Sequence, residues 1–537
     1  MKLTLSGLQE LEAWKAAGIS LPSYDPVLLR RRTAAAPRWI HFGAGNIFRM
    51  FLGSVADRLI SAGCMDTGLI CAEAYDMEII DRIYRPFDNL LLSLILNRDG
   101  TIDRQILAPF CEALKASPKE AEDWAMLGAR FCAPSLQMVS FTVTEKAYAL
   151  ADASGNLTPA ASADMDAGPQ HTDSLIGTVT SLLYLRYLAG GHPLALVSMD
   201  NCSGNGDRLF GAVTQMADAW RARSLVPAGF TAWLRDKSQV SFPCTMIDKI
   251  TPRPSAELAE ELAAAGLEDM APIVTSRDTY IAPFGNAEKA QYLVIEDAFP
   301  NGRPPLEKAG VFMADKEIVR KAERMKVCTC LNPIHTGLCT YGCLLGYTLF
   351  ADAIQDPDLA ELACLIGRKE GLPVVSDPGI LNPGRFLEEV LTERFPNRFL
   401  GDTSARIAVD ISQMMGIRFG ETIRAYVNRD GSAEQLVGIP LAIAGWLRYL
   451  LAVDDAGNPM ELSPDPMLPE LRRALSPVQF GNPESVTSDV LSPLLSNERI
   501  FGLDLRQAGI AEKITELLRE ETAGPGAVRR TLQRALA

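Results

Sequence analysis

The apolar positions divide the chain into a first part that mixes strands with helices and a second part of helices alone. In the first part, short apolar runs bounded by glycine, proline and polar residues precede segments with an apolar residue at every third or fourth position. Such alternation favours a mostly parallel sheet covered by helices. The expected strands are 38–42, 67–76, 135–148 and 193–201, and the expected helices lie within 47–63 and 173–188.

In the second part, after "FPNGRPP" (299–305), helical periodicity dominates to the end of the chain. Two segments, 151–170 and 454–470, contain proline and glycine and are expected to be loops. The pattern therefore predicts an N-terminal α/β domain over residues 1–310 and a mainly α-helical C-terminal domain over residues 311–537. The candidate helices of the second part are 338–354, 385–394, 403–426, 438–452 and 506–521.

Composition and charge narrow the class of protein. The net charge of −14 argues against a nucleic-acid partner, whose phosphates attract a basic surface. The 11 cysteines have no repeated spacing, which favours a reduced, cytoplasmic protein over a disulfide framework. The most apolar long stretch, 337–354, is interrupted by Gly, Thr and Asp and predicts a buried helix, with no membrane span. Residues 1–19 have the pattern of a helix with polar interruptions and not of a signal peptide.

A glycine turn after the first strand is the first candidate site. Gly43 and Gly45 in "HFGAGNIFR" stand between a strand and a helix, where glycine permits a tight turn and lets backbone N–H groups approach a pyrophosphate. Asn46 and Ile47 begin the helix, and Phe48 occupies the place of the usual third glycine. We expect a Rossmann-like dinucleotide site; the alternative is a plain tight turn.

An acid at the end of the second strand would bind the ribose of such a dinucleotide. Glu73 and Asp76 are both candidates, and the sequence does not distinguish them. Either carboxylate would repel a 2′-phosphate, so NAD is favoured over NADP. The alternative for at least one of the two is a surface carboxylate.

The stretch "MKVCTCLNPIHTGLC" (325–339) is the second candidate site. Asn332 followed by Pro333 predicts a helix start, with asparagine as the N-cap and proline as the first helical residue. His335 then lies in the first turn and Lys326 lies just before it. The positive end of the helix and burial would lower the proton affinity of both side chains, and a lysine tuned in this way is a usable general base. The alternatives are a solvent-facing lysine and a core histidine.

The same stretch allows a metal site as a further alternative. Cys328, Cys330, His335 and Cys339 are possible ligands, and two thiols in an extended 328–330 segment would share one face. The Cys-x-Cys spacing is shorter than the usual ligand spacing, so we expect no metal.

Six segments together resemble the polyol-specific long-chain dehydrogenase family, which includes mannitol dehydrogenases, fructuronate reductases and tagaturonate reductases. The resemblance runs from about residue 38 to residue 450. Its motifs are "HFGAGNIFR" (41–49), "TVTEKAY" (142–148), "SMDNCSGNGDRL" (198–209), "VSFPCTMIDKITPRP" (240–254), "YLVIEDAFPNGRPPLEKAGV" (292–311) and "DTSARIAVDISQ" (402–413).

The resemblance implies a metal-free, NAD-dependent dehydrogenase that uses a lysine as general acid and base. The implied roles are Lys326 as that group, Asn201 and Asn332 at the reacting oxygen, His335 as an orienting group, Asp248 and Arg406 at substrate hydroxyls, Glu323 on the proton route, and Thr144 and Glu145 beside the nicotinamide. The sequence departs from the family pattern in having five residues between Lys326 and Asn332 instead of four. It also departs in having Pro333 where glycine is common and Met414 where a lysine is usual.

The chain length and the motifs "GAGNIFR" and "CLNPIHT" are most similar to the bacterial branch associated with hexuronate breakdown, which indicates D-mannonate and D-fructuronate as the reacting pair. Mannitol with fructose and altronate with tagaturonate remain alternatives. Arg406, Arg253 and Arg418 are candidate partners for a substrate carboxylate. Relatives are often monomers, so we expect a monomer. A lysine Schiff-base enzyme and an NAD-binding sensor without turnover are the rival classes.

Overall fold

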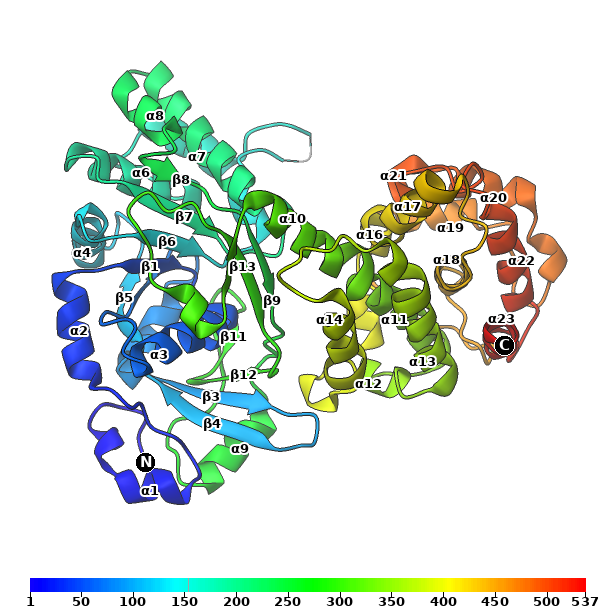
Figure 1. Ribbon diagram of the computed structural model, residues 1–537, viewed down its shortest axis with the longest axis horizontal. Coiled ribbons are helices and arrows are strands. Elements are labelled where there is room, and N and C mark those ends of the chain that lie inside the picture. Colours follow the sequence, from blue (N-terminus) through cyan, green and yellow to red (C-terminus); the bar gives the residue numbers. More distant parts are fainter. Residues whose placement is uncertain (153) are drawn as a thin grey trace. The chain divides into compact units, whose positions relative to one another are not determined.

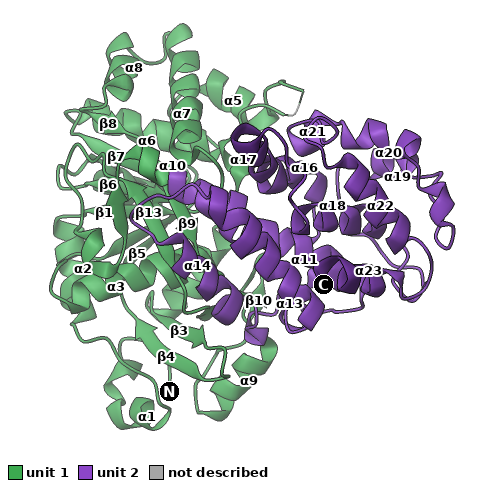
Figure 2. Ribbon diagram, turned by 45° about the vertical axis from the view of Figure 1, so that its right-hand side comes forward, with its two compact units in different colours: residues 1–320 green, residues 321–537 purple. Residues whose placement is uncertain are grey.

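The computed structural model describes residues 1–152 and 154–537. Within this part the chain forms two compact units, residues 1–320 and residues 321–537 (Figure 2). The first is built around a parallel sheet and the second from helices. The expected α/β class of the first part and helical class of the second are confirmed.

A six-stranded parallel sheet forms the centre of the first unit (Figure 1). Its strand order is β5-β2-β1-β6-β7-β8, the order of a doubly wound dinucleotide-binding fold. The chain adds β2 and β5 on one side of β1 and then β6, β7 and β8 on the other side. The strand order therefore reverses between β1 and β6. The strands are β1 (Trp39–Phe42), β2 (Leu69–Glu73), β5 (Phe110–Lys115), β6 (Met138–Phe141), β7 (Leu194–Ser198) and β8 (Val240–Ser241).

Side chains of this sheet enter two apolar cores, one on each face. In β1, Trp39 packs into one core, while Ile40 and Phe42 pack into the other, as the two-residue period of a strand requires. Burial on both faces explains why these strands are continuous apolar runs in the sequence. The flanking helices are α3 (Gly53–Ser61), α4 (Ala121–Cys132), α6 (Leu175–Leu188), α7 (Asn205–Ala222) and α8 (Ala228–Arg235).

Three smaller sheets complete the first unit, and the apolar pattern did not predict them. Most of their strands are short, and one pairing joins segments that lie far apart in the sequence, since β12 pairs with β3 across about 190 residues. Because β14 pairs with β13, residues 312–314 belong to this unit. The strands are β3 (Leu91–Leu96), β4 (Ile102–Leu107) and β12 (Phe284–Ala287); β9 (Thr245–Asp248), β13 (Tyr292–Glu296) and β14 (Phe312–Ala314); and β10 (Ile273–Val274) with β11 (Tyr280–Ile281).

The second unit packs its helices around α11 and α18, whose residues are almost all buried. Several helices contain π-helical turns, which add one residue to an α-helical turn. The main elements are α11 (Asn332–Leu344), α13 (Pro357–Cys364), α14 (Pro383–Glu389), α15 (Ser404–Ile407), α16 (Ile411–Met415), α17 (Glu421–Asp430), α18 (Gly438–Tyr449), α22 (Ala511–Glu521) and α23 (Ala527–Leu536). The π-helical turns discussed below are η7 (Met325–Cys330), η10 (Val390–Arg394) and η12 (Gly416–Gly420).

Several predicted elements differ from the structure. The strand expected over 135–148 ends at Phe141, because a 3-10 turn, η5 (Glu145–Tyr148), follows it. The expected loop 151–170 contains α5 (Pro159–Ala167), which Thr158 caps by accepting the Ala161 N–H; residue 153 of that loop lies outside the described residues. The expected helix 403–426 is broken by Asp410, whose φ is +56°. In these segments a capping side chain or a residue in the left-handed conformation determined where helices begin and end, and the spacing of apolar residues did not.

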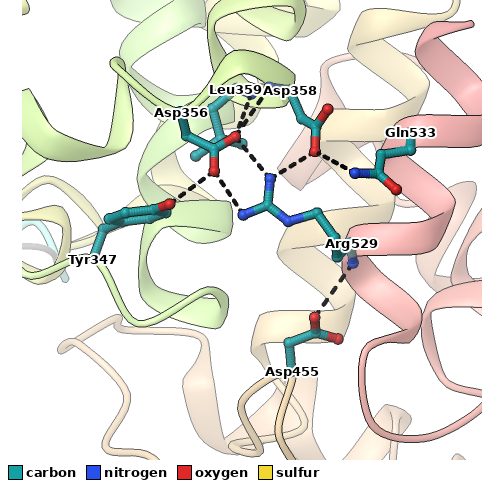
Figure 3. Close-up of polar contacts among 7 residues, drawn as sticks. All are labelled: Tyr347, Asp356, Asp358, Leu359, Asp455, Arg529 and Gln533. Carbon is teal, nitrogen blue, oxygen red and sulfur yellow. Dashed lines mark hydrogen bonds and ion pairs between the residues drawn. The ribbon is translucent and has the colours of Figure 1, made fainter.

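The last helix of the chain is tied to α13 by a polar cluster around Arg529 (Figure 3). Its guanidinium donates to both Asp356 oxygens at 2.7 and 2.6 Å and to Asp358 at 2.7 Å. The main-chain N–H of Arg529 lies 3.4 Å from the Asp455 carboxylate, and Tyr347 donates to Asp356 at 2.8 Å. Burial alone would raise the pKa of Asp356, but hydrogen bonds from Arg529, Tyr347 and the Leu359 N–H outweigh this effect and lower the pKa to about 2. The C-terminal helix is thus part of the second unit's framework.

The Arg529 cluster predicts a stability effect. Replacing Arg529 by Ala leaves Asp356, whose side chain is 5% exposed, without its cation, and we expect a loss of about 3 kcal/mol. Thermal unfolding should then shift down by roughly 6–12 °C. Arg534→Ala is the matched control, because its pair with Glu520 is surface-exposed and is expected to contribute under about 1 kcal/mol. Equal shifts for both variants would contradict the assignment.

Candidate functional site

The carboxyl ends of β1, β2, β6 and β7 lie at one edge of the parallel sheet (Figure 1). In open α/β sheets this edge, at the strand-order reversal, is where ligands bind. The candidates Gly43, Glu73, Thr144 and Asn201 follow or end these four strands. The register of the parallel pairs thus brings together residues that are up to about 160 positions apart in the sequence.

The glycine turn has the shape that a dinucleotide requires. Gly43 has φ +110°, and a Cβ there would lie 2.3 Å from the Thr142 main-chain oxygen, so no other residue fits. A Cβ on Gly45 would meet nothing within 4 Å, so this glycine faces open space at the helix start. Asn46 and Ile47 form the first helical residues, and Ile47 is 38% exposed. An open face at the start of a helix suits a pyrophosphate.

The two candidate ribose acids have different surroundings. Glu73 accepts the Ala44 N–H at 2.7 Å with one oxygen, and the Tyr75 and Asp76 N–H groups at 2.7 and 3.1 Å with the other. Its carboxylate therefore holds the glycine turn against the end of β2. Asp76 accepts from the Thr275 hydroxyl at 2.6 Å, and its second oxygen has no hydrogen-bond partner among the described residues.

Three of the other first-unit candidates follow β6 or β7, and the fourth, Asp248, lies on β9 of a smaller sheet. Thr144 and Glu145 are exposed, and Glu145 forms an ion pair with Arg208 of α7. Asn201 is exposed in the turn after β7. Asp248 is buried and ends β9, opposite Tyr292 of β13.

Lys326 is buried in the π-helical turn η7, which continues α10 (Lys316–Arg324). The Leu331 N–H donates to the Lys326 carbonyl at 3.1 Å, the i to i+5 bond of a π turn. This turn accommodates the extra residue between Lys326 and Asn332. Glu323 is half-buried on α10, one turn before Lys326.

The predicted cap at Asn332 is wrong by one position. Leu331 is the N-cap, with φ −136° and no side-chain cap bond, and Asn332 is the first residue of α11. The buried Oδ1 of Asn332 has no partner among the described residues, so its amide is not used to cap the helix. The helix can begin in this way because Pro333, which has no N–H, stands in its first turn.

His335 is a neutral imidazole in an aromatic pocket. Its ring stacks on Phe395 at 5.2 Å and meets Phe350 edge-on at 4.5 Å. Burial, and then the positive charges of Arg418, Arg394 and Arg406, lower the pKa of His335 to about 3. The predicted lowering of the pKa and the predicted contribution of burial are confirmed, and the further cause is the charge of the three guanidinium groups. A histidine of this kind orients a partner by hydrogen bonding and does not act as an acid near neutral pH.

The three guanidinium groups near His335 differ in their partners. Arg418 lies in η12 and donates to the Thr336 hydroxyl at 2.5 Å, and its buried Nε has no partner among the described residues. Arg394 ends η10 and is buried. Arg406 is 70% exposed and is paired with Asp402 at 2.8 Å.

The cysteines of the second candidate site are packing residues. Cys328 and Cys330 lie in the π-helical turn, so the extended conformation considered for them is wrong. The Cys339 thiol donates to the Thr336 carbonyl at 3.2 Å, and burial raises the pKa of all three thiols. Among the residues that the structure describes, no three His, Cys, Asp or Glu side chains are grouped as a metal ion would need.

Other findings concern residues that sequence reasoning missed. Asp200, Tyr148 and Asn205 form a buried polar network at the ends of β6 and β7. These residues lie within the motifs "TVTEKAY" (142–148) and "SMDNCSGNGDRL" (198–209), but the sequence assigned them no role. In the described part of the chain, none of the helices is long and apolar enough to span a bilayer.

Comparisons with known proteins identify the family. The model described as the mannitol dehydrogenase Rossmann domain matches residues 119–308, and the model of the mannitol dehydrogenase C-terminal domain matches residues 319–521. A D-mannonate oxidoreductase from Thermotoga maritima is 47% identical over 99% of this chain and 98% of its own length. A D-mannonate oxidoreductase from Escherichia coli K12 is 30% identical over 91% of this chain and 92% of its own.

A solved structure has the same fold. The substrate-free crystal structure of a D-sorbitol dehydrogenase superposes with a TM-score of 0.79 at 25% identity, covering 97% of this chain and 98% of that one. The two family models, the long alignments and the doubly wound sheet agree with the expected oxidoreductase class and with NAD as cofactor. The chain belongs to the mannitol dehydrogenase family and is an NAD-dependent oxidoreductase that acts on a CH–OH group.

Proposed function

We propose that this enzyme interconverts D-mannonate and D-fructuronate with NAD, without a catalytic metal. We base the substrate assignment on the 47% identity, over nearly the whole of both chains, to a protein named D-mannonate oxidoreductase. We further propose that residues 1–310 bind NAD, that residues 311–537 supply the catalytic lysine, and that the protein acts as a monomer in the cytoplasm.

The proposed chemistry uses Lys326 as the proton carrier. In the oxidation direction NAD accepts the hydride from the substrate carbon. Neutral Lys326 takes the proton of the reacting hydroxyl, and in reduction its ammonium group returns a proton to the forming alkoxide. The amides of Asn201 and Asn332 would donate to that oxygen, and a donor of this kind contributes about 2.7–4 kcal/mol to transition-state stabilisation. The Asn332 Oδ1 has no partner among the described residues, so no cap bond holds this amide in another orientation. Glu323, one turn before Lys326, would pass the proton to solvent.

The guanidinium groups around His335 support a substrate with a carboxylate. Their combined charge is strong enough to contribute to the low pKa of His335, and a carboxylate bound there would be stabilised by the same charge. At position 414 the family pattern usually has a lysine, whereas this chain has Met414; Arg418 follows four residues later. The Nε of Arg418 has no hydrogen-bond partner among the described residues. We propose Arg418 as the carboxylate partner, with His335, Arg406 and Asp248 orienting the hydroxyl groups.

At the cofactor end we propose that Asp76 binds the ribose and that Glu73 holds the glycine turn. The Glu73 oxygens already accept three main-chain N–H groups, whereas one Asp76 oxygen has no partner in the described chain. Thr144 and Glu145 would line the nicotinamide end, and Gly43, Gly45, Asn46 and Ile47 the pyrophosphate.

Lys326→Ala tests the proposed base. We expect wild-type enzyme to oxidise NADH with D-fructuronate, and the variant to lose about 10³-fold in kcat because no other group replaces the proton carrier. Lys369→Ala is the control, since this lysine is exposed and pairs with Glu361. Unchanged activity of Lys326→Ala would place the base elsewhere.

Two further outcomes of this assay separate the rival classes. Borohydride trapping of substrate on the enzyme would favour a Schiff-base mechanism, and NADH binding without turnover of any hexuronate or polyol would favour a sensor.

Asp76→Asn and Glu73→Gln test the division of roles between the two acids. Loss of a charged hydrogen bond to the ribose should raise the KM for NAD about 10- to 100-fold in Asp76→Asn, with little change in kcat. Glu73→Gln should instead lower the melting temperature, because it weakens three hydrogen bonds to buried backbone N–H groups. The reverse pattern would assign the ribose to Glu73.

Arg418→Met tests the substrate class. With D-fructuronate we expect kcat/KM to fall about 10–100-fold, because a charged hydrogen bond is lost, whereas any activity with neutral D-fructose should change little. Arg429→Met is the control, since Arg429 is exposed and paired with Asp430. Equal losses with both ketoses would show that Arg418 does not recognise the carboxylate.

A further inference from the structure

A buried carboxylate joins the ends of β6 and β7. Asp200 follows β7 and is 8% exposed. One of its oxygens accepts the Val143 N–H at 2.6 Å, and the other accepts the Tyr148 hydroxyl and, at 3.3 Å, the Ser198 hydroxyl. Val143 and Tyr148 flank the exposed segment that contains Thr144. A single carboxylate therefore fixes both ends of that segment.

Asn205 continues the same network toward β9. It is fully buried at the start of α7, and its amide nitrogen donates to the Asp200 carbonyl at 2.9 Å and to the Thr245 carbonyl and hydroxyl at 3.1 and 3.0 Å. Its amide oxygen accepts the Thr245 N–H at 2.9 Å. The Thr245 hydroxyl donates to the Ser198 carbonyl at 2.7 Å, so the end of β7, the start of α7 and the start of β9 are locked together.

The locked segments carry residues that the proposed function uses. The loop after β6 holds Thr144 and Glu145, the turn between Asp200 and Asn205 holds Asn201, and β9 ends at Asp248. The network's own oxygens are occupied by protein donors, so it acts through these neighbours and not on substrate directly. We propose that Asp200, supported by Tyr148 and Asn205, is a positioning residue that aligns the nicotinamide-side loop with the Asn201 turn. This inference rests on the proposed placement of the nicotinamide at this edge of the sheet.

The charge of Asp200 gives this role a pH dependence. Burial raises the pKa of its carboxyl group to about 7. The titratable group in contact with it is Tyr148 from η5, whose pKa is raised by burial and then by the charge of Asp200; Cys202, in the turn after β7, acts on Tyr148. The ion pair between Glu145 and Arg208 lies on the exposed side of the same segment. Above pH 7 the ionised carboxylate accepts the Val143 N–H and the Tyr148 hydroxyl hydrogen bonds. Below pH 7 the carboxyl group is protonated and neutral, like the asparagine amide of an Asp200→Asn variant.

Asp200→Asn and Tyr148→Phe test the proposal in the full-length enzyme. At pH 8 we expect Asp200→Asn to lose about 10- to 100-fold in kcat, because misplacement of reacting groups by about 1 Å has that effect. At pH 6 the loss should shrink to about 2- to 10-fold, since roughly nine-tenths of the wild-type carboxyl groups are then protonated. Without substrate at pH 8, the dissociation constant for NADH should rise about tenfold, while that for ADP-ribose, which lacks the nicotinamide, should stay within about twofold. Tyr148→Phe should show the same pattern with smaller changes.

Asp164→Asn is the matched control. Asp164 is an equally buried aspartate of the same unit that accepts the Asp173 and Ser174 N–H groups at 2.8 and 2.9 Å, and its partners include no proposed site residue. We expect it to lower the melting temperature and leave the kcat ratio between pH 6 and pH 8 unchanged.

The proposal is overturned if Asp200→Asn weakens NADH and ADP-ribose equally, if its deficit is the same at both pH values, or if Asp164→Asn gives the same pattern. Should Asp200→Asn not fold, Tyr148→Phe decides by the same criteria. Failure of wild-type enzyme to reduce D-fructuronate would contradict the proposed substrate. The binding of NADH and ADP-ribose is measured without substrate, so it would still test the role of Asp200.

Discussion

The close contact between the β1 turn and its two neighbouring strands is the constraint on which the first unit depends. The Gly43 N–H donates to the Ala72 carbonyl, the Phe42 carbonyl accepts the Thr142 N–H, and the missing side chain of Gly43 leaves room for the Thr142 oxygen. The carboxyl ends of β1, β2 and β6 are therefore aligned with one another. The acidic and amide side chains that follow these strands lie at the same edge of the sheet. A side chain at position 43 would separate β1 from β6 at the edge where we propose that the cofactor binds.

The candidate sites of the two units contain buried charges of opposite sign. In the first, Glu73 and Asp200 are buried carboxylates that accept main-chain N–H groups, so each acid fixes the backbone of a loop. In the second, guanidinium groups surround a neutral His335. Anionic groups thus stabilise the cofactor side, and cationic groups gather on the unit that we propose contacts the substrate. The guanidinium groups beside His335 agree with the proposed sugar-acid substrate, which is based on the 47% identity to a D-mannonate oxidoreductase.

Two candidate residues of the second unit, and one further arginine near His335, lie on π-helical turns. Lys326 lies in η7, Arg394 in η10 and Arg418 in η12. A π turn widens the helix by one residue and is less stable than an α turn, so it persists only where packing compensates for it, and such turns are frequent at functional sites. Each turn rotates the side chains that follow it relative to an uninterrupted α-helix. The family-typical spacing of Lys326 and Asn332 can therefore change by one residue without loss of the helix.

The sequence alone determined the α/β class of the first part, the helical second part, the glycine turn and the family motifs, because apolar period and local turn chemistry are properties of neighbouring residues. It did not predict β3 with β12, the helix α5, the true start of α11 or the Asp200 network. Nor did it distinguish Glu73 from Asp76, whose partners, Ala44 and Thr275, are 29 and 199 positions away. Only the tertiary structure determined these features, since a buried polar side chain takes its role from whichever donors the fold places beside it.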